Sequence, residues 1–435
     1  MPAKLLIIQV AALGHDLVAS TNPKLGGRTW RSAESVFPAV TCTAQATLRT
    51  AVPPGKHGMV SNGRYFPELA KPLFWEQSSN LVTGPRIWDQ ARARGLRVGM
   101  MFWQQSLGES VDLVLSPKPI HKHGGGMIQN CYCRPRDLYE GLAKRIGKPF
   151  NLMHYWGPLA SRKSTEWIVE ALEAVMREPD WAPDLLLGYL PHLDYDLQRQ
   201  GPDSEKVKAA VGQLDGYLSR LIAAASNQGY EIFVAGDYSI GRVTAEPVFP
   251  NLALREAGLF DVTQVGRRTY PDFFGSAAFA VVDHEIAHVY VQKPGRVEKV
   301  RELLAGLPGV EEVLDAKAQG ARDVSHASSG TFLLVAKSGQ WFAYPWWTER
   351  EEEPDFASHV DIHNKPGFDP CELFFGWPPP GVSRDPGRVR GSHGRSGPGR
   401  AIAWTSTVDF PGNPETFLDL ATALKSWIGE TCTIL

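Results

Sequence analysis

The chain has 435 residues, of which 43% are hydrophobic and 21% are charged, and its formal net charge is −2 at pH 7. This composition is typical of a globular protein with a large core, built as one elaborate α/β domain or as two domains. The balanced charge and the short apolar runs give no reason to expect a nucleic acid polymer or a membrane as partner. Five scattered cysteines and no signal-peptide pattern indicate a reduced protein of the cytoplasm.

The first part of the chain alternates apolar runs of strand length with stretches of helical periodicity. Residues 5–11 form a continuous apolar run, which suits the interior of a parallel sheet. Strands that alternate with helices predict an α/β fold with a mostly parallel central sheet flanked by helices. We expect further strands at 96–102, 184–190 and 231–235, and helices at 86–94, 165–176 and 204–225.

The pattern changes between residues 263 and 347, where short strand-like runs surround one helical stretch. We expect a small inserted α+β lobe there, with an α/β core formed by residues 1–262 and 348–435. Residues 354–399 are rich in Pro, Gly, His and Arg and predict a long loop region, which compact domains usually keep for function. Strands are expected at 279–282, 289–292, 310–314 and 332–335, and helices at 295–304 and 414–427.

The most informative stretch reads Pro-Ala-Val-Thr-Cys-Thr-Ala-Gln over residues 38–45 and places Thr41 at the start of a short helix. A threonine hydroxyl is a poor nucleophile at neutral pH, but the free N–H groups and the dipole at a helix start favour an anion there. Thr41 could instead be a simple N-cap, a common role for threonine. Thr43 is the alternative candidate for a nucleophile.

This stretch is followed by a Pro…His-Gly…Asn turn that ends at Asn62. Together the two segments resemble the nucleophile region of the alkaline phosphatase superfamily, in its nucleotide pyrophosphatase/phosphodiesterase branch. The resemblance implies an alkaline-phosphatase-like α/β fold and a hydrolase that acts on a small-molecule phosphate ester. It also implies that Thr41 is both nucleophile and metal ligand, and that Asn62 donates to a non-bridging phosphate oxygen.

Three later motifs resemble the superfamily's metal ligands. After the strand at 184–190, Asp194 fits the family pattern, although it could be an ordinary turn residue, and Gln198 stands where the family has a histidine. After the strand at 231–235, Asp237 is kept and Tyr238 replaces a histidine. The run Gly-Ser-His-Gly-Arg resembles the late Ser-His-Gly of phosphonoacetate-hydrolase-like members, which implies that His393 binds metal.

Two further clusters could add ligands. Residues 283–288 read Asp-His-Glu-Ile-Ala-His, and strand alternation would put His284 and His288 on one face with Asp283 opposite. Residues 361–370 resemble the family's His-Gly-Phe/Tyr-Asp segment, with His363 displaced upstream. Any of these histidines could instead be a hydrogen-bonded structural group. The whole set of motifs resembles a bacterial type I phosphodiesterase-like subgroup from about residue 5 to residue 395.

The first strand departs from the family, which normally delivers an aspartate to the metal there. This chain reads Ile-Gln-Val-Ala-Ala over residues 8–12, and neither Gln9 nor Asp16 is a good substitute. The resemblance still implies one or two divalent ions, with zinc expected and manganese as the alternative.

Two classes of function remain open on the sequence. The first is a metal-dependent phosphodiesterase-like hydrolase that forms a phosphothreonine, or a phosphotransferase that uses the same intermediate. The second is a catalytically degenerate protein that binds a phosphorylated ligand. Phe74, Trp75, Phe102, Trp103, Tyr155 and Trp156 could line an aromatic pocket for a flat leaving group or could simply pack in the core.

Overall fold

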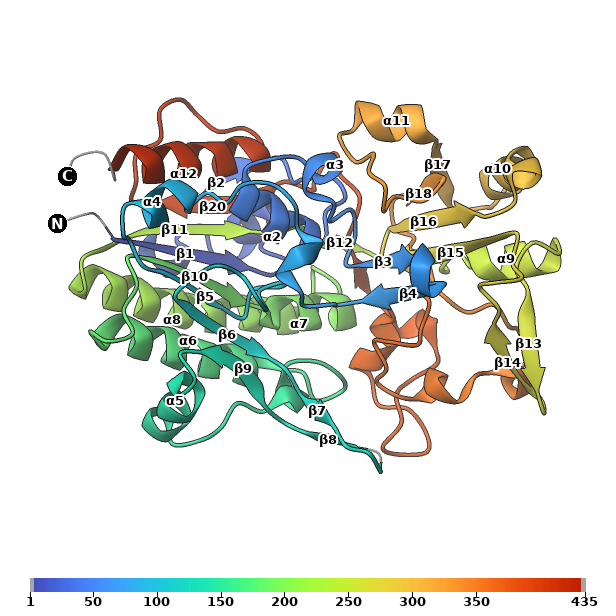
Figure 1. Cartoon of the computed structure of the whole chain (residues 1–435), viewed down its shortest axis with the longest axis horizontal. Coiled ribbons are helices and arrows are strands. Elements are labelled where there is room, and N and C mark those ends of the chain that lie inside the picture. The colour runs from blue at the N-terminus through green and yellow to red at the C-terminus, as the bar shows by residue number, and fades with distance from the viewer. Residues whose placement is uncertain (1–3, 125, 432–435) are drawn as a thin grey trace.

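The computed structural model describes residues 4–124 and 126–431. Its centre is an eight-stranded sheet in the order β2-β20-β11-β1-β10-β5-β6-β9 (Figure 1). The five inner strands from β11 to β6 run parallel, and β20 and β9 pair antiparallel at the two sides. This confirms the predicted α/β fold. The strands are β1 (Lys4–Val10), β2 (Arg31–Ala33), β5 (Val98–Met101), β6 (Leu113–Pro117), β9 (Cys131–Arg134), β10 (Leu185–Leu190), β11 (Tyr230–Gly236) and β20 (Ile402–Ser406).

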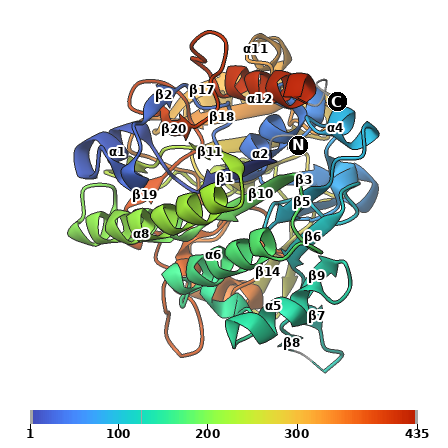
Figure 2. The ribbon, with the colours of Figure 1, turned by 90° about the vertical axis from the view of Figure 1, so that its left-hand side faces the viewer.

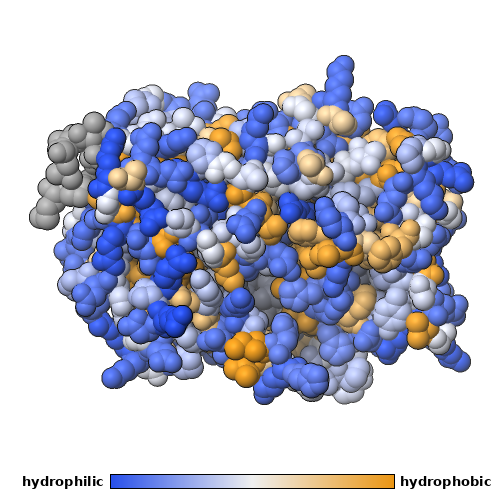
Figure 3. Space-filling model, viewed as in Figure 1, coloured by the Kyte–Doolittle hydropathy of each residue, from blue (hydrophilic) through white to orange (hydrophobic). Residues whose placement is uncertain are grey.

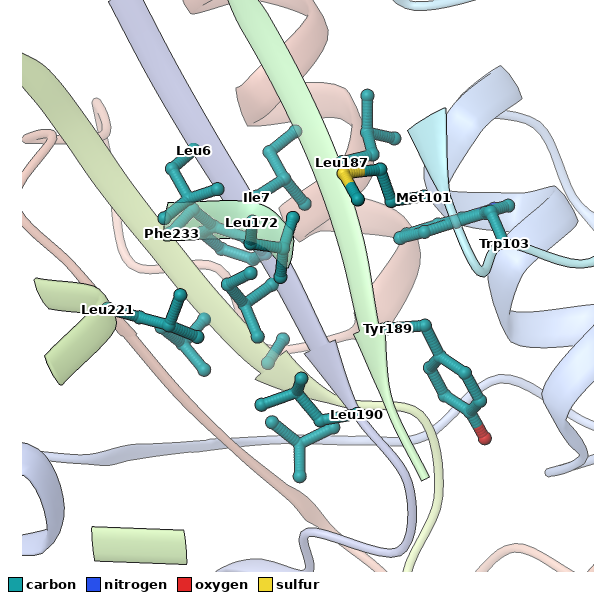
Figure 4. Packing of buried hydrophobic residues seen from close by; sticks show 14 of the residues in the cluster. Leu6, Ile7, Met101, Trp103, Leu172, Leu187, Tyr189, Leu190, Leu221 and Phe233 are labelled. Atoms are coloured by element: carbon teal, nitrogen blue, oxygen red, sulfur yellow. The ribbon is translucent and has the colours of Figure 1, made fainter. Parts of the chain in front are cut away.

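Helices cover both faces of this sheet (Figure 2). On one face, α6 (Arg162–Arg177) and α8 (Glu205–Asn227) pack against β10 and β11. Their apolar stripes meet side chains that alternate along the strands, so that Leu6, Leu172, Leu221 and Phe233 lie together in the core (Figure 4). The other helices around the sheet are α1 (His15–Thr21), α2 (Thr41–Thr50), α3 (Pro54–His57), α4 (Asp89–Ala93), α5 (Leu138–Ile146), α7 (His192–Gln200) and α12 (Phe417–Thr431).

A second, four-stranded antiparallel sheet lies beside the first, in the order β15-β16-β18-β17 (Figure 1). Its strands are β15 (Ala278–Asp283), β16 (Ile286–Val291), β17 (Val310–Leu314) and β18 (Phe332–Ala336). We call the segment 263–347 that contains this sheet the inserted lobe. Around its sheet lie α9 (Pro250–Glu256), α10 (Val297–Ala305), α11 (Ala316–Ala321) and the hairpin of β13 (Val262–Val265) and β14 (Arg268–Pro271).

The remaining strands are short pairs: β3 (Gly63–Phe66) with β4 (Lys71–Phe74), β7 (Ile120–His121) with β8 (Met127–Ile128), and β12 (Gly241–Arg242) with β19 (Gly391–Ser392). The view of Figure 3 shows a mostly hydrophilic surface with scattered apolar residues. No helix in the described part of the chain has the length and apolar character that crossing a membrane requires.

Two sequence predictions need correction. The stretch after β10, where no helix was predicted and Asp194 could have been a turn residue, contains the helix α7, so Asp194 and Gln198 are helical residues one turn apart. The cluster 283–288, expected as one strand, contains the tight turn between β15 and β16. His284 occupies that turn with a φ of 61°, a conformation that a continuous strand does not allow.

Candidate active site

Thr41 is the first residue of α2 and does not act as its cap. The capping position belongs to Val40, whose backbone is extended and whose side chain makes no capping hydrogen bond. The Thr41 hydroxyl interacts instead with the hydroxyls of Tyr189, at the end of β10, and of Tyr238. Thr43 is fully buried, and its hydroxyl has no partner among the described residues. The Thr41 hydroxyl thus lies among the polar side chains at the strand ends, whereas the Thr43 hydroxyl does not.

The Asn62 side chain is fixed beside this helix start. Its Oδ1 accepts a hydrogen bond from the backbone N–H of Cys42 (3.0 Å), and its Nδ2 donates to Oδ1 of Asp283 (3.1 Å). The backbone N–H of Asn62 donates to the other oxygen of Asp283 (2.7 Å). These bonds fix the orientation of the amide, with its Oδ1 on the residue directly after Thr41.

Asp194 is the carboxylate at the centre of the site. It accepts hydrogen bonds from the Tyr238 hydroxyl (2.9 Å) and from Nε2 of Gln198 (2.7 Å). Burial raises the pKa of this carboxyl to about 6, although both hydrogen bonds oppose the shift. Nε2 of His393 lies 4.0 Å from Oδ1 of Asp194. Residues from three distant parts of the sequence thus meet at the carboxyl end of the sheet.

Four rings form a stacked column next to Asp194. The His393 ring lies 3.6 Å from the Tyr238 ring and 3.7 Å from the His284 ring, and His284 lies 3.7 Å from Phe368, all measured between centroids. Nδ1 of His393 donates to the carbonyl of Ala39 (2.8 Å), and Nδ1 of His284 donates to the Asp283 carboxylate (2.8 Å). Both imidazoles therefore carry their lone pair on Nε2. Burial lowers the pKa of each well below its ordinary value, which keeps the rings neutral.

Both oxygens of the Asp237 carboxylate already accept hydrogen bonds from other groups of the protein. Its Oδ1 accepts from the backbone N–H groups of Ala12 and Tyr238 (2.9 Å each), and its Oδ2 accepts from Tyr189 (3.4 Å). Burial raises its pKa well above the ordinary value. Ala11 and Ala12, which directly follow β1, bring no side-chain donor to this position. Tyr238 gives its hydroxyl hydrogen to Asp194, so it positions that carboxylate in this arrangement.

The donor set fits one cation better than two. Two buried acceptor atoms, Nε2 of His284 and Oε1 of Gln198, have no partner among the described residues. Gln198 bonds Asp194 through its Nε2, and the His284 ring stacks on that of His393. A bound metal cation would satisfy such unpaired lone pairs near a carboxylate. A second ion at Asp237 would lack the first-strand carboxylate. Side chains in the described segments are not already gathered into a group of three or more His, Cys, Asp or Glu around a common metal position.

His288 and His363 do not join this cluster. His288 donates from Nε2 to the Val60 carbonyl (3.1 Å) and accepts from Gly330 N–H at Nδ1 (3.1 Å), so both ring nitrogens are already used by backbone groups of the protein. His363 lies half-buried on the loop after β18, where its ring meets that of His121 at 6.0 Å.

The aromatic residues divide between core and site. Phe74, Phe102 and Trp103 are buried in the cores, and Tyr155 packs on Phe102. Trp75 and Trp156 are half-buried and both contact Phe368, the ring that stacks on His284. These two tryptophans are the members of the predicted set that can face a ligand.

Sequence reasoning missed Asp283 as a member of the site. It placed this residue on the opposite face from His284, because it assumed an uninterrupted strand. The adjacent Asp-His pair was the available signal, since a carboxylate next to an imidazole commonly fixes the histidine tautomer.

The chain matches the family model described as type I phosphodiesterase / nucleotide pyrophosphatase over residues 26–369. An uncharacterized pyrophosphatase/phosphodiesterase of Schizosaccharomyces pombe is 24% identical over 186 residues, which cover 43% of this chain and 32% of that protein. The match therefore spans about a third of that relative's length.

Solved structures share the fold over nearly the whole chain. The phosphonoacetate hydrolase of Sinorhizobium meliloti 1021, in complex with phosphonoformate, aligns with a TM-score of 0.64 at 15% identity and covers 99% of this chain and 96% of its own. Murine ectonucleotide pyrophosphatase/phosphodiesterase 5 aligns with a TM-score of 0.60 at 14% identity, covering 98% and 95%. Because the family model matches most of the chain, this chain belongs to the type I phosphodiesterase / nucleotide pyrophosphatase family, a family of phosphoester hydrolases.

Proposed function

We propose that this protein hydrolyses a small-molecule phosphate ester, with a phosphodiester or nucleotide pyrophosphate as the expected class, through a covalent intermediate on Thr41. The observation that carries the proposal is the placement of Thr41 at the first helical position of α2, with the Asn62 amide fixed beside it. One structural neighbour supports the role, because a Thr-to-Ala form of murine ectonucleotide pyrophosphatase/phosphodiesterase 5 is described as inactive in its complex with AMP.

In the proposed reaction the Thr41 oxygen attacks phosphorus, and the bond from phosphorus to the leaving-group oxygen breaks. The leaving group takes up a proton, and water then cleaves the phosphothreonine and restores the Thr41 hydroxyl. We expect the N–H groups at the start of α2, other than that of Cys42, and the second Nδ2 hydrogen of Asn62 to stabilise the negative charge on the non-bridging oxygens. We expect Trp75 and Trp156, which both contact Phe368, to contact a flat leaving group.

Asp194, His393 and Gln198 are the residues that we expect to hold a divalent ion, zinc or alternatively manganese, with the Thr41 hydroxyl beside it. When bound, such an ion lowers the pKa of a hydroxyl nucleophile and withdraws charge from phosphoryl oxygens. Asp237 and Tyr238 support this arrangement from the neighbouring strand end, through the hydrogen bonds described above. A role for His363 or His288 as a ligand stays a prediction without a contact to support it.

The test compares Thr41→Ala with Thr43→Ala as a matched control on the same helix. Turnover of a nitrophenyl phosphodiester and of the monoester is measured with added zinc or manganese, and trapped protein is analysed for phosphothreonine by mass spectrometry. We expect Thr41→Ala to abolish turnover and the covalent adduct, and Thr43→Ala to retain both. Full turnover in Thr41→Ala would refute the nucleophile.

A second candidate function is binding of a phosphorylated ligand without turnover. The observation that favours it is the first-strand end, where Ala11 and Ala12 provide only a backbone N–H to Asp237. A protein that binds AMP or inorganic phosphate but shows no turnover with either ion would support this candidate over the hydrolase.

A further inference from the structure

We propose that Glu372 is a positioning residue for Trp156: it fixes the indole beside Phe368 and thereby sets how strongly the site prefers ligands that carry a flat ring. The inference rests on the proposed function in one respect, namely that the site binds a phosphate ester. It adds a buried network to the site, because Glu372 and the lysine that holds it lie in the irregular segment 359–374.

The first argument is the hydrogen bond of the Trp156 indole. Its Nε1 donates to Oε2 of Glu372 at 2.6 Å, which joins residues 216 positions apart in the sequence. Trp156 is half-buried, whereas Glu372 is only 2% exposed. An indole has a single N–H donor, and a hydrogen bond to a carboxylate is stronger than one between neutral groups. This bond therefore fixes the rotation of a ring that is only partly enclosed by the protein.

The second argument is the way Lys365 holds Glu372. The ammonium of this buried lysine donates to Oε1 of Glu372 and to Oδ2 of Asp369 (2.7 Å each), and to the carbonyl of His359 (2.9 Å), which uses all three of its hydrogens. The backbone N–H of Asp361 donates to the same Glu372 oxygen (2.9 Å). Replacing a buried ion pair by apolar residues is often neutral for stability, so this network suits a role in fixing one geometry.

The third argument is that α7 ties both partners of this hydrogen bond to the site. Arg199, in the last turn of α7, donates from Nε to the carbonyl of the residue after Glu372 (2.9 Å). Its Nη1 and Nη2 donate to carbonyls of residues 157–160, which directly follow Trp156. The same helix carries Asp194. The segments of Trp156 and Glu372 are therefore held on the element that also positions the central carboxylate.

The fourth argument is the group of rings to which Trp156 belongs. Phe368 stacks on His284 and contacts both half-buried tryptophans, at 5.4 Å from Trp156 and 6.4 Å from Trp75 between ring centroids. The backbone N–H of Trp75 donates to the carbonyl of Asn62 (3.2 Å), so these rings adjoin the expected phosphate donor. A ligand with its phosphate at Asn62 can therefore place a flat ring against them, where stacking is favourable.

Phe368 is held independently of Glu372. Its backbone N–H donates to the carbonyl of Val282, near the end of β15 (2.9 Å). Gly367 allows this approach, because a Cβ there would lie 2.3 Å from Cγ2 of Val282. Loss of the Glu372 carboxylate should therefore release the Trp156 indole and leave Phe368 in place.

The experiment compares AMP with ribose 5-phosphate, which share a sugar and a phosphate and differ in the flat ring. Binding of each compound to the full-length chain is measured by calorimetry. The readout is the ratio of the two affinities, because a loss of folded protein or of the phosphate site would weaken both compounds equally and leave the ratio unchanged.

The variants are Glu372→Met, Trp156→Phe and the double variant. Glu372→Met removes the acceptor of the indole but leaves the pair of Lys365 with the neighbouring carboxylate of Asp369 balanced. Trp156→Phe keeps an aromatic ring and removes the N–H donor. Glu353→Met is the matched control, because it breaks the ion pair of Glu353 with an arginine of the same loop region (3.0 Å) and leaves the bond of the indole intact.

We expect the unmodified protein to bind AMP about 5–150-fold more tightly than ribose 5-phosphate, since stacking of one base on an aromatic side chain contributes that much. Glu372→Met and Trp156→Phe should each lower this ratio at least about 3-fold, and the double variant should lower it no further, because both changes remove the same hydrogen bond. The ratio in Glu353→Met should change less than about 2-fold, because its site of change is independent of the indole.

An unchanged ratio in Glu372→Met, or losses that add in the double variant, would overturn the inference and leave the proposed function standing. An equal fall of the ratio in Glu353→Met would also overturn it, because the effect would then belong to the folding of the loop region. Equal affinities of the unmodified protein for the two compounds would overturn it as well. Binding of neither compound by the unmodified protein would refute the proposed function together with the inference.

Discussion

His57 should make the protein sensitive to acid, because its buried imidazole must stay neutral in the folded state. Its Nδ1 accepts a hydrogen bond from Met59 N–H (3.1 Å), and its Nε2 lies 2.9 Å from the Thr47 hydroxyl. That hydroxyl gives its hydrogen to the Thr43 carbonyl, so the proton of the imidazole lies on Nε2. Protonating Nδ1 would break the bond to Met59, three residues before Asn62.

The size of the effect follows from the shift in pKa. Burial, aided by the positive charge of Arg49, lowers the pKa of His57 to about 3, whereas the pKa of a histidine in an unfolded chain is about 6.5. Between these two pH values the unfolded chain binds a proton that the folded chain does not bind. Stability therefore falls as the pH decreases from 6.5 towards 3, and at pH 5 the loss from this group is about 2 kcal/mol relative to pH 7.

The measurement is the free energy of unfolding in urea at pH 7 and pH 5, for the unmodified protein and for His57→Asn. Asparagine can still accept from Met59 N–H but does not titrate. The variant should lose about 2 kcal/mol less between the two pH values than the unmodified protein. His192, whose pKa burial lowers to about 4, titrates in both proteins and cancels in the difference. Equal losses in the two proteins would refute a neutral, buried His57.

The parts of the site that lie on regular elements were predictable from sequence. Asp194 and Asp237 each follow a parallel strand, and the carboxyl ends of such strands meet at one edge of the sheet, whereas Thr41 was predicted from the helix start that follows an apolar run. The helix α7 was missed because Pro191 and Gly201 border it, and both residue types also mark loops. In the folded chain this helix packs against α8, a contact between elements that the local sequence does not reveal.

The contribution of the inserted lobe could not be predicted in the same way. The turn at His284 contains none of the usual hairpin residues Gly, Asn or Pro, and an alternation rule applied across residues 283–288 then assigns Asp283 to the face opposite His284. The approach of His393 to His284 depends on Glu285 lying against the segment after β19, a contact between distant residues. Gly394, with a φ of 124°, allows that close approach, and a Cβ there would lie 3.2 Å from Glu285 N.

Two further predictions concern the supports of the site. Replacing Arg400 by Met removes the ion pair of the buried Glu285 carboxylate and should lower the free energy of unfolding by about 3–5 kcal/mol. Adding Glu285→Gln to this variant should recover part of the loss. If the double variant recovers nothing, the two side chains do not form a direct pair. Replacing Ala11 by Asp puts a carboxylate at the end of β1, where the next residue's N–H bonds Asp237. Without metal, two buried like charges should lower the melting temperature, because neither can be solvated. With zinc, the variant should regain stability and bind one more equivalent than the unmodified protein, since the missing ligand is then present. A melting temperature that zinc does not raise would show that the loss of the first-strand acid is not what limits the site to one ion.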